Sequence, residues 1–228
     1  TGRMELVDSS LVVNGSREIT VGENKGSFGE MVLNGGTVSS SGNLTLMVGR
    51  KGSGKLTINK GTLTAYAVFN GYESDSPLTE VVINGGKMEV TAGNNDNDNS
   101  WYAFRVGQGM TSGTARLVLN GGELQAARVF CNKTFGEFEA NGGTLVAYSP
   151  SVSAKNTIHL KGFGSAKLGS LGLTIRADKA SHTKQNFCDL AGHEGSGLLR
   201  LTGAGVKYLY GTDSKESIMR CVEGKTVL

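Results

Sequence analysis

Proline is almost absent from this sequence, which has 2 prolines but 35 glycines in 228 residues. The glycine share is about twice the usual one, yet no three-residue glycine period occurs, which excludes a collagen-like chain. Apolar residues recur throughout, so the composition also argues against a disordered chain. The 23 basic and 20 acidic residues leave a net charge of +3 without a lysine or arginine run. We therefore expect no nucleic-acid partner.

Long apolar runs are also missing, and cysteines are few. No segment approaches the roughly 20 apolar residues that span a bilayer, so we expect no membrane insertion. The three cysteines, Cys131, Cys188 and Cys221, lie far apart, and no Cys-x-x-Cys motif occurs. Their odd number leaves at least one unpaired, and we interpret them as buried free thiols. The sequence predicts no cofactor.

The sequence does contain a repeat built around asparagine. Six asparagines, spaced by 20, 25, 25, 36 and 21 residues, occupy equivalent positions: Asn14, Asn34, Asn59, Asn84, Asn120 and Asn141. An apolar residue precedes each of them directly: Val13, Leu33, Ile58, Ile83, Leu119 and Ala140. On both sides of most of these turns, apolar and polar residues alternate with a period of two. This pattern predicts half-buried β-strands.

A third short apolar stretch follows each repeat, beginning for example at Val48, Val68 and Val106. Three short strands and three turns use about 20 to 25 residues, which is the observed spacing. We therefore expect an all-β chain that winds as a parallel β-solenoid, with three short strands per coil and about ten coils. Equivalent apolar residues would then lie over one another, about 4.8 Å apart.

The asparagines of this repeat predict a structural ladder at one corner of the coil. Their side-chain amides can bond along the stacking direction, and the glycine that follows supplies the positive φ that a tight corner needs. The predicted ladder consists of Asn34, Asn59, Asn84, Asn120 and Asn141.

An insertion over residues 92 to 103 interrupts the repeat and supplies the candidate ligand-binding residues. Asp96 and Asp98 lie in an asparagine-rich stretch, and Trp101 and Tyr102 follow it. The two carboxylates are interpreted as part of a solvated loop, and calcium binding by this loop is the alternative. The aromatic pair packs the loop onto the protein or, alternatively, stacks on sugar rings. Insertions in repeat proteins often lie on the binding face.

The chain is expected to form a single domain over residues 1–228, with regular repeats over 11–148 and less regular coils over 149–228. It begins Thr1-Gly2-Arg3 without methionine, which we interpret as a fragment of a longer chain. Residues 221 to 228 are expected to form a strand without a polar cap. This end should therefore continue into further sequence or pair with another copy, giving end-to-end self-association.

Two segments resemble the passenger-domain repeats of bacterial autotransporters, namely GSGKLTINKGTLT and LTGAGVKYLYG. The resemblance implies a right-handed, single-stranded parallel β-helix in a secreted or cell-surface bacterial protein. It implies a glycan or host-surface ligand, because that family is mostly adhesins and surface structures. It carries no catalytic residue over to this chain.

The favoured functional hypothesis is a non-catalytic segment that serves as a structural stalk or adhesion module, with glycan as a candidate ligand. The alternative is a polysaccharide-active enzyme, a lyase or glycoside hydrolase, with its cleft on the face that carries the 92 to 103 insertion. Such an enzyme needs carboxylates or basic groups that face one another across a groove.

Overall fold

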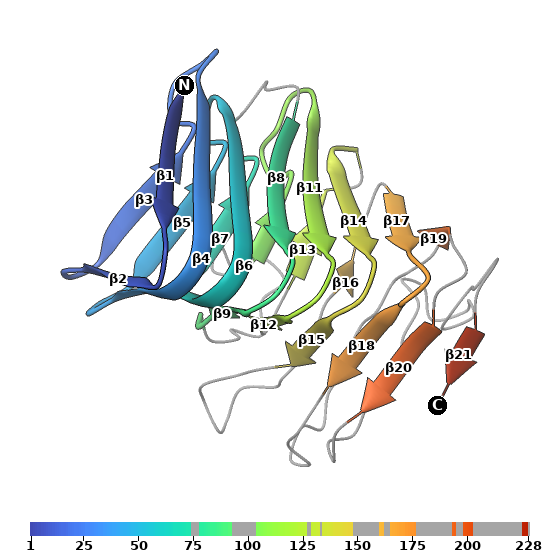
Figure 1. The fold of residues 1–228 in the computed structure, drawn as a ribbon. Helices are drawn as coiled ribbons and strands as arrows, with labels where there is room; N and C mark the ends of the chain where they lie inside the picture. Colours follow the sequence, from blue (N-terminus) through green and yellow to red (C-terminus); the bar gives the residue numbers. More distant parts are fainter. Residues whose placement is uncertain are drawn as a thin grey trace.

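The computed structural model describes residues 1–73, 78–92, 104–126, 129–132, 134–147, 160–161, 165–176, 193–194, 198–202 and 225–227. All regular structure in these ranges is β-strand, and the strands belong to two parallel sheets (Figure 1). Within the same ranges, no helix has the length and hydropathy needed to cross a membrane.

The larger sheet has 15 strands: β1 (Gly2–Leu6), β2 (Ser9–Val13), β4 (Phe28–Ser40), β6 (Ser53–Ala65), β8 (Leu78–Ile83), β9 (Lys87–Val90), β11 (Thr114–Leu119), β12 (Glu123–Ala126), β14 (Gly136–Ala140), β15 (Thr144–Ala147), β17 (Ser165–Leu168), β18 (Leu173–Arg176), β19 (His193–Glu194), β20 (Leu198–Thr202) and β21 (Lys225–Val227). The smaller sheet has six strands: β3 (Arg17–Val21), β5 (Leu44–Val48), β7 (Ala67–Asn70), β10 (Phe104–Val106), β13 (Val129–Cys131) and β16 (Leu160–Lys161).

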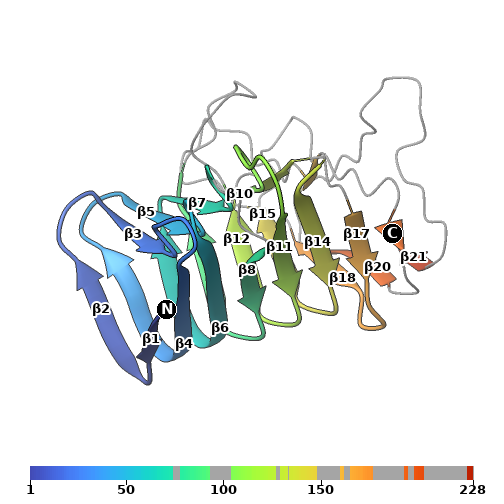
Figure 2. The same cartoon turned by 90° about the horizontal axis from the view of Figure 1, so that it is seen from above.

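The chain alternates between these two sheets and returns to each sheet beside the strand that it left (Figure 2). It leaves β4 for β5 in the smaller sheet, and then returns as β6, which pairs in parallel with β4. Each return aligns equivalent repeat residues, so that Leu33 pairs with Ile58 and Ile58 pairs with Ile83. The period-two alternation then directs apolar side chains into the space between the sheets.

Those inward side chains form one continuous core. Leu33, Ile58, Ile83 and Leu119 are 0% exposed and lie in one column of the larger sheet. Val68 and Phe104 pair with each other in the smaller sheet and are equally buried. Full burial of one such side chain contributes roughly 1.5–3 kcal/mol, so the stacked columns supply the main stabilisation of the fold.

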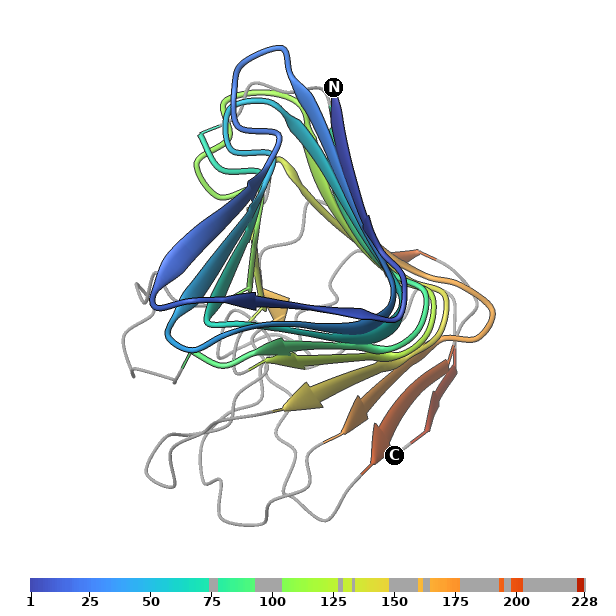
Figure 3. The ribbon, with the colours of Figure 1, turned by 60° about the vertical axis from the view of Figure 1, so that its left-hand side comes forward.

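The prediction of a right-handed single-stranded parallel β-helix with three short strands per coil and about ten coils is wrong. The structure contains two parallel sheets, and the larger one bends so that, with the separate smaller sheet, it nearly encloses the core (Figure 3). Strands β4 and β6 are 13 residues each, and β6 pairs with both β8 and β9. Two predicted short strands are therefore one bent strand, because backbone pairing continues through the corner.

The predicted alignment of the first repeat is also wrong. Val13 pairs with Ser40 and so lies outside the column of Leu33, where Leu6 of β1 takes the expected place. Asn14 consequently lies outside the asparagine column as well. Alignment on asparagine missed β1 because its end carries no Asn-x-Gly turn.

Glycine permits the close approach of successive corners. The second residue after each ladder asparagine is a glycine with positive φ: Gly36, Gly61, Gly86, Gly122 and Gly143. At Gly86 the φ is +68°, and a Cβ would lie 2.5 Å from the carbonyl oxygen of Gly61. No L side chain fits such a position without backbone movement.

Replacing Gly86 by alanine should destabilise the protein more than replacing Gly26. Gly26 also has a positive φ, +74°, but nothing lies within 4 Å of the position that an added Cβ would take. Gly26→Ala should therefore cost about 1–2 kcal/mol from backbone strain alone. Gly86→Ala should add about 1–3 kcal/mol from the steric conflict. Urea denaturation of both variants measures the difference, and equal losses would contradict the corner-packing argument.

Candidate functional site

The outer surface of the larger sheet carries a ladder of asparagine side chains. The structure brings together the five asparagines that the sequence singled out. The Nδ2 of each donates to the Oδ1 of the preceding one: Asn59 to Asn34 at 2.7 Å, Asn84 to Asn59 at 2.7 Å, Asn120 to Asn84 at 2.7 Å, and Asn141 to Asn120 at 2.8 Å. These bonds link repeats that are 21 to 36 residues apart in sequence.

This asparagine ladder has a direction. Every amide donates toward the N-terminal end, where Asn34 Nδ2 donates to Oε1 of Glu5 at 2.6 Å. Hydrogen bonds arranged head to tail polarise one another, and a carboxylate is a stronger final acceptor than an amide. Glu5 therefore terminates the ladder, although it is separated from Asn34 by 29 residues. The sequence pattern did not reveal this role, because Glu5 precedes the first recognised repeat.

A second ladder, of charged side chains, runs parallel to the first. Paired positions in neighbouring strands place opposite charges next to one another in one column: Arg3, Glu30, Lys55, Glu80, Arg116 and Glu137. Sequence reasoning missed this alternating column, because these residues fall into a line only when the strand pairing is known. The sequence does contain a sign of this column, because a charged residue stands three positions before each of Leu33, Ile58, Ile83 and Leu119.

Two residues of this charge ladder, Glu80 and Arg116, each form ion pairs with two partners. Glu80 lies 3.4 Å from Lys55 Nζ and 3.5 Å from Arg116 Nη1, and 16% of its side chain is exposed. Arg116 Nε also lies 3.0 Å from Glu137 Oε2. Exposed ion pairs contribute little singly, but like charges opposite each other in a sheet are unfavourable. The alternation therefore favours this strand alignment over a shifted one.

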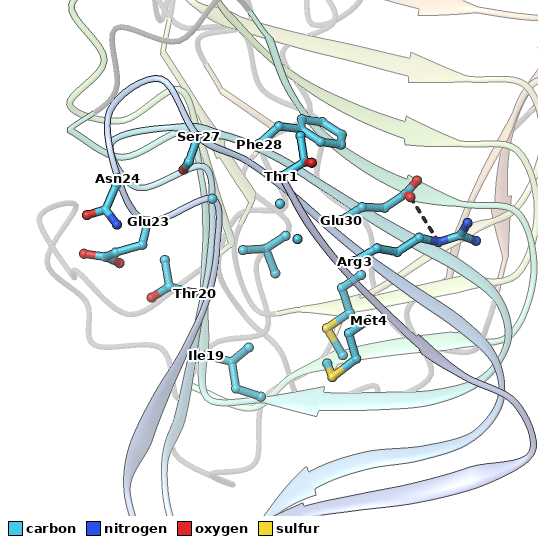
Figure 4. A pocket seen from close by; sticks show the side chains of 15 residues that line it. Thr1, Arg3, Met4, Ile19, Thr20, Glu23, Asn24, Ser27, Phe28 and Glu30 are labelled. Atoms are coloured by element: carbon cyan, nitrogen blue, oxygen red, sulfur yellow. Dashed lines mark ion pairs between the residues drawn. The ribbon is translucent and has the colours of Figure 1, made fainter.

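At the N-terminal end, the core opens into a hollow. It has a volume of about 560 Å³ and lies between β1, β3 and the start of β4 (Figure 4). Met4, Ile19, Phe28 and Met31 give it an apolar lining, while the ion pair of Arg3 and Glu30 lies on its rim. Met4 is 39% exposed, although Met31 and Leu56, the next residues of its column, are buried, and Phe28 is also 39% exposed.

A shallower hollow, of about 550 Å³, lies over the start of the smaller sheet. Polar side chains and one tyrosine line it: Ser16, Arg17, Glu18, Asn43, Thr45 and Tyr66. Tyr66 also packs against a small outer cluster that contains Met47, Ala67 and Phe69. An aromatic ring beside hydroxyl, amide and charged groups is a combination that suits a polar ring-shaped ligand.

The four residues predicted to bind a ligand, Asp96, Asp98, Trp101 and Tyr102, lie outside the described residues. Their grouping therefore stays a prediction. Within the described ranges, no three histidine, cysteine, aspartate or glutamate residues gather closely enough to hold a metal ion.

Comparison with known proteins gives no relative. No protein-family model, curated protein or solved structure matches this chain.

Removal of one amide from the middle of the asparagine ladder should weaken the fold. Asn84→Ala deletes one donated and one accepted bond, and should lower the free energy of unfolding by about 1–2 kcal/mol. Asn43→Ala is the control, because Asn43 is also exposed but lies outside the ladder. The control should change stability by less than about 0.5 kcal/mol. Chemical denaturation measures both, and a loss at Asn84 no larger than at Asn43 would show that the ladder is energetically neutral.

Charge reversal at Glu80 should destabilise the protein in a salt-dependent manner. Glu80→Lys would place three cations in succession in the charge ladder, and we expect a loss of about 1–2 kcal/mol at low salt. Added salt should reduce this loss by screening. Glu73→Lys makes the same charge change at an exposed position outside the column. Thermal denaturation across a salt series compares them, and parallel responses of the two variants would rule out a specific role for the column.

Proposed function

We propose that this chain is a non-catalytic structural segment of a secreted or cell-surface bacterial protein, where it serves as a stalk or adhesion module. The observation that carries the proposal is the pair of continuous ladders along the larger sheet. Each strand of these ladders pairs only with the adjacent strands of its sheet, so the same pairing could extend a structure to any length. A long, repetitive surface held together in this way suits a spacer or a scaffold.

The proposed secreted or cell-surface localisation of the protein comes from the sequence resemblance. The segment around Gly52 to Ala65, which resembles autotransporter passenger repeats, forms strand β6 and supplies Lys55 and Asn59 to the two ladders. The residues that carry the resemblance are therefore also residues that stabilise the stacked strands. This agreement supports a structural task for the repeat and, with it, the secreted or surface setting that the resemblance implies.

Glycan is the ligand class that we propose for the adhesive function. The hollow around Tyr66 combines an aromatic ring with Arg17, Asn43 and Thr45. Sugars present an apolar ring face for stacking and a rim of hydroxyl groups for hydrogen bonds, which such a set of side chains can meet. The insertion that contains Trp101 and Tyr102 remains the second candidate contact surface from the sequence.

The alternative, a polysaccharide-active enzyme, depends on the 92 to 103 insertion, of which residues 93–103 lie outside the described part of the chain. On the described residues, Glu30, Glu80 and Glu137 each pair with a basic neighbour in the charge ladder. Carboxylates used in this way support the strand stack, which favours the structural proposal over the enzymatic one.

Glycan-array binding together with a polysaccharide cleavage assay tests the proposed function. The wild-type protein should bind at least one glycan class and should leave acidic polysaccharides intact. Tyr66→Ala should weaken that binding about tenfold through loss of ring stacking, whereas Tyr66→Phe should retain it. Cleavage of any polysaccharide would contradict the non-catalytic assignment. Glycan binding by Tyr66→Ala as tight as that of the wild-type protein would exclude the hollow around Tyr66 as the binding site.

A further inference from the structure

Two buried polar residues lie where the smaller sheet passes into the larger one. Asn70 ends β7, Thr79 is the second residue of β8, and both residues are 0% exposed. The residues that pair beside them in neighbouring strands are apolar: Val48 and Val106 beside Asn70, and Ala115 beside Thr79. Both residues are therefore polar departures from apolar columns, in the middle of the stack of strands.

Half of the Asn70 amide has a partner within the protein. Its Nδ2 donates to the backbone carbonyl oxygen of Arg116 in β11 at 2.8 Å. Because a carbonyl oxygen can only accept, this bond fixes which side of the amide carries Oδ1. Among the residues that the structure describes, no group donates to this Oδ1. Buried side-chain oxygens are nearly always hydrogen-bonded, so Oδ1 marks the place of a further donor.

The hydroxyl of Thr79 also has no hydrogen-bond partner within the described ranges. Gly71 directly follows Asn70, and Thr79 Oγ1 lies 3.1 Å from the position that a Cβ on Gly71 would take. Glu80, which follows Thr79, pairs with Arg116, whose carbonyl accepts the bond from Asn70. Two separate relations therefore place this hydroxyl and the Asn70 amide at the same corner of the core.

We propose that Asn70 and Thr79 form an internal site that binds one water molecule. The water donates one hydrogen to Oδ1 of Asn70, and its oxygen accepts the hydroxyl hydrogen of Thr79. One molecule thus supplies both the donor and the acceptor that these two buried groups require. The bound water joins β7 of the smaller sheet to β8 of the larger sheet. This site lies inside the fold, so it goes beyond the proposed function and does not depend on it.

The surroundings of the site favour water over a cation. Both side-chain oxygens are uncharged, whereas hard cations take six or more oxygen ligands, commonly from carboxylates. Apolar atoms lie close by, since Met110 Sδ and Ala115 Cβ are 2.4 and 3.0 Å from the position of a Cβ on Gly71. A charge would be costly in such surroundings. A single neutral molecule with two hydrogen-bonding functions meets the same requirement without that cost.

A double-mutant cycle tests whether the two residues act through one ligand. Thr79→Val removes the hydroxyl, and Asn70→Val inserts the residue type of the neighbouring strands. Thr79→Val alone should lower the folding equilibrium constant about tenfold, because the water loses a partner and holds Oδ1 of Asn70 less well. In the Asn70→Val background, the same change should cost less than about threefold. Urea denaturation measures all four proteins.

Thr57→Val is the matched control for the loss of a threonine hydroxyl. Thr57 lies in β6 between Val32 and Val82, so valine is also the residue type of its neighbouring strands. This substitution should change the folding equilibrium constant less than about threefold. Equal losses from Thr79→Val in the two Asn70 backgrounds would overturn the proposal, because they would show that the residues act independently.

High-resolution crystal structures identify the ligand. The wild-type protein should show one water about 2.7–3.0 Å from both Asn70 Oδ1 and Thr79 Oγ1. The Thr79→Val structure should lack this water and should otherwise keep the strand pairing. A direct hydrogen bond from Thr79 Oγ1 to Asn70 Oδ1, or a site without water in the wild type, would overturn the proposal. The wild-type structure decides the question even where a variant fails to fold.

Discussion

Parallel backbone pairing between successive passages of the chain is the constraint on which the rest of the structure depends. It sets the spacing between neighbouring strands and holds equivalent residues of each repeat side by side. Once Leu33, Ile58 and Ile83 are aligned in this way, their neighbours must align as well. The apolar core, the asparagine ladder and the charge ladder are three results of one alignment. Each of them in turn opposes a shift of the strands, because a shift by one residue would exchange the inner and outer faces.

The corners decide how closely the passages can approach. The glycines at Gly61 and Gly86 lie against the backbone of the preceding corner, so that the strand pairing continues from one side of the larger sheet to the other. This continuity explains why β4 and β6 are long bent strands. It also brings the asparagine amides within hydrogen-bond distance of one another. Side chains alternate along a strand, so each asparagine that follows a buried residue points outward.

The interactions that stabilise the interior depend on strands with parallel neighbours. Inside the stack, strands such as β6 and β11 have a parallel neighbour on both sides. Among the described strands, β1 pairs only with β4, and Met4 is 39% exposed whereas its partner Met31 is 1% exposed. The adhesion module that we propose would present its lateral surface, including the hollow around Tyr66, to ligands.

The sequence by itself determined the strand character of the repeats and the alternation of apolar residues, since both depend on neighbours within a few residues. It also determined the alignment of five asparagines, because the same short motif recurs around each of them. Only the tertiary structure decided that strands join through the corners, that Leu6 instead of Val13 continues the core column, and that Glu5 ends the asparagine ladder. The alternation of Arg3, Glu30, Lys55 and Glu80 also became evident only there. The physical reason is that these relations join residues 25 or more positions apart. Such contacts depend on which strands pair, and a local sequence pattern does not specify strand pairing.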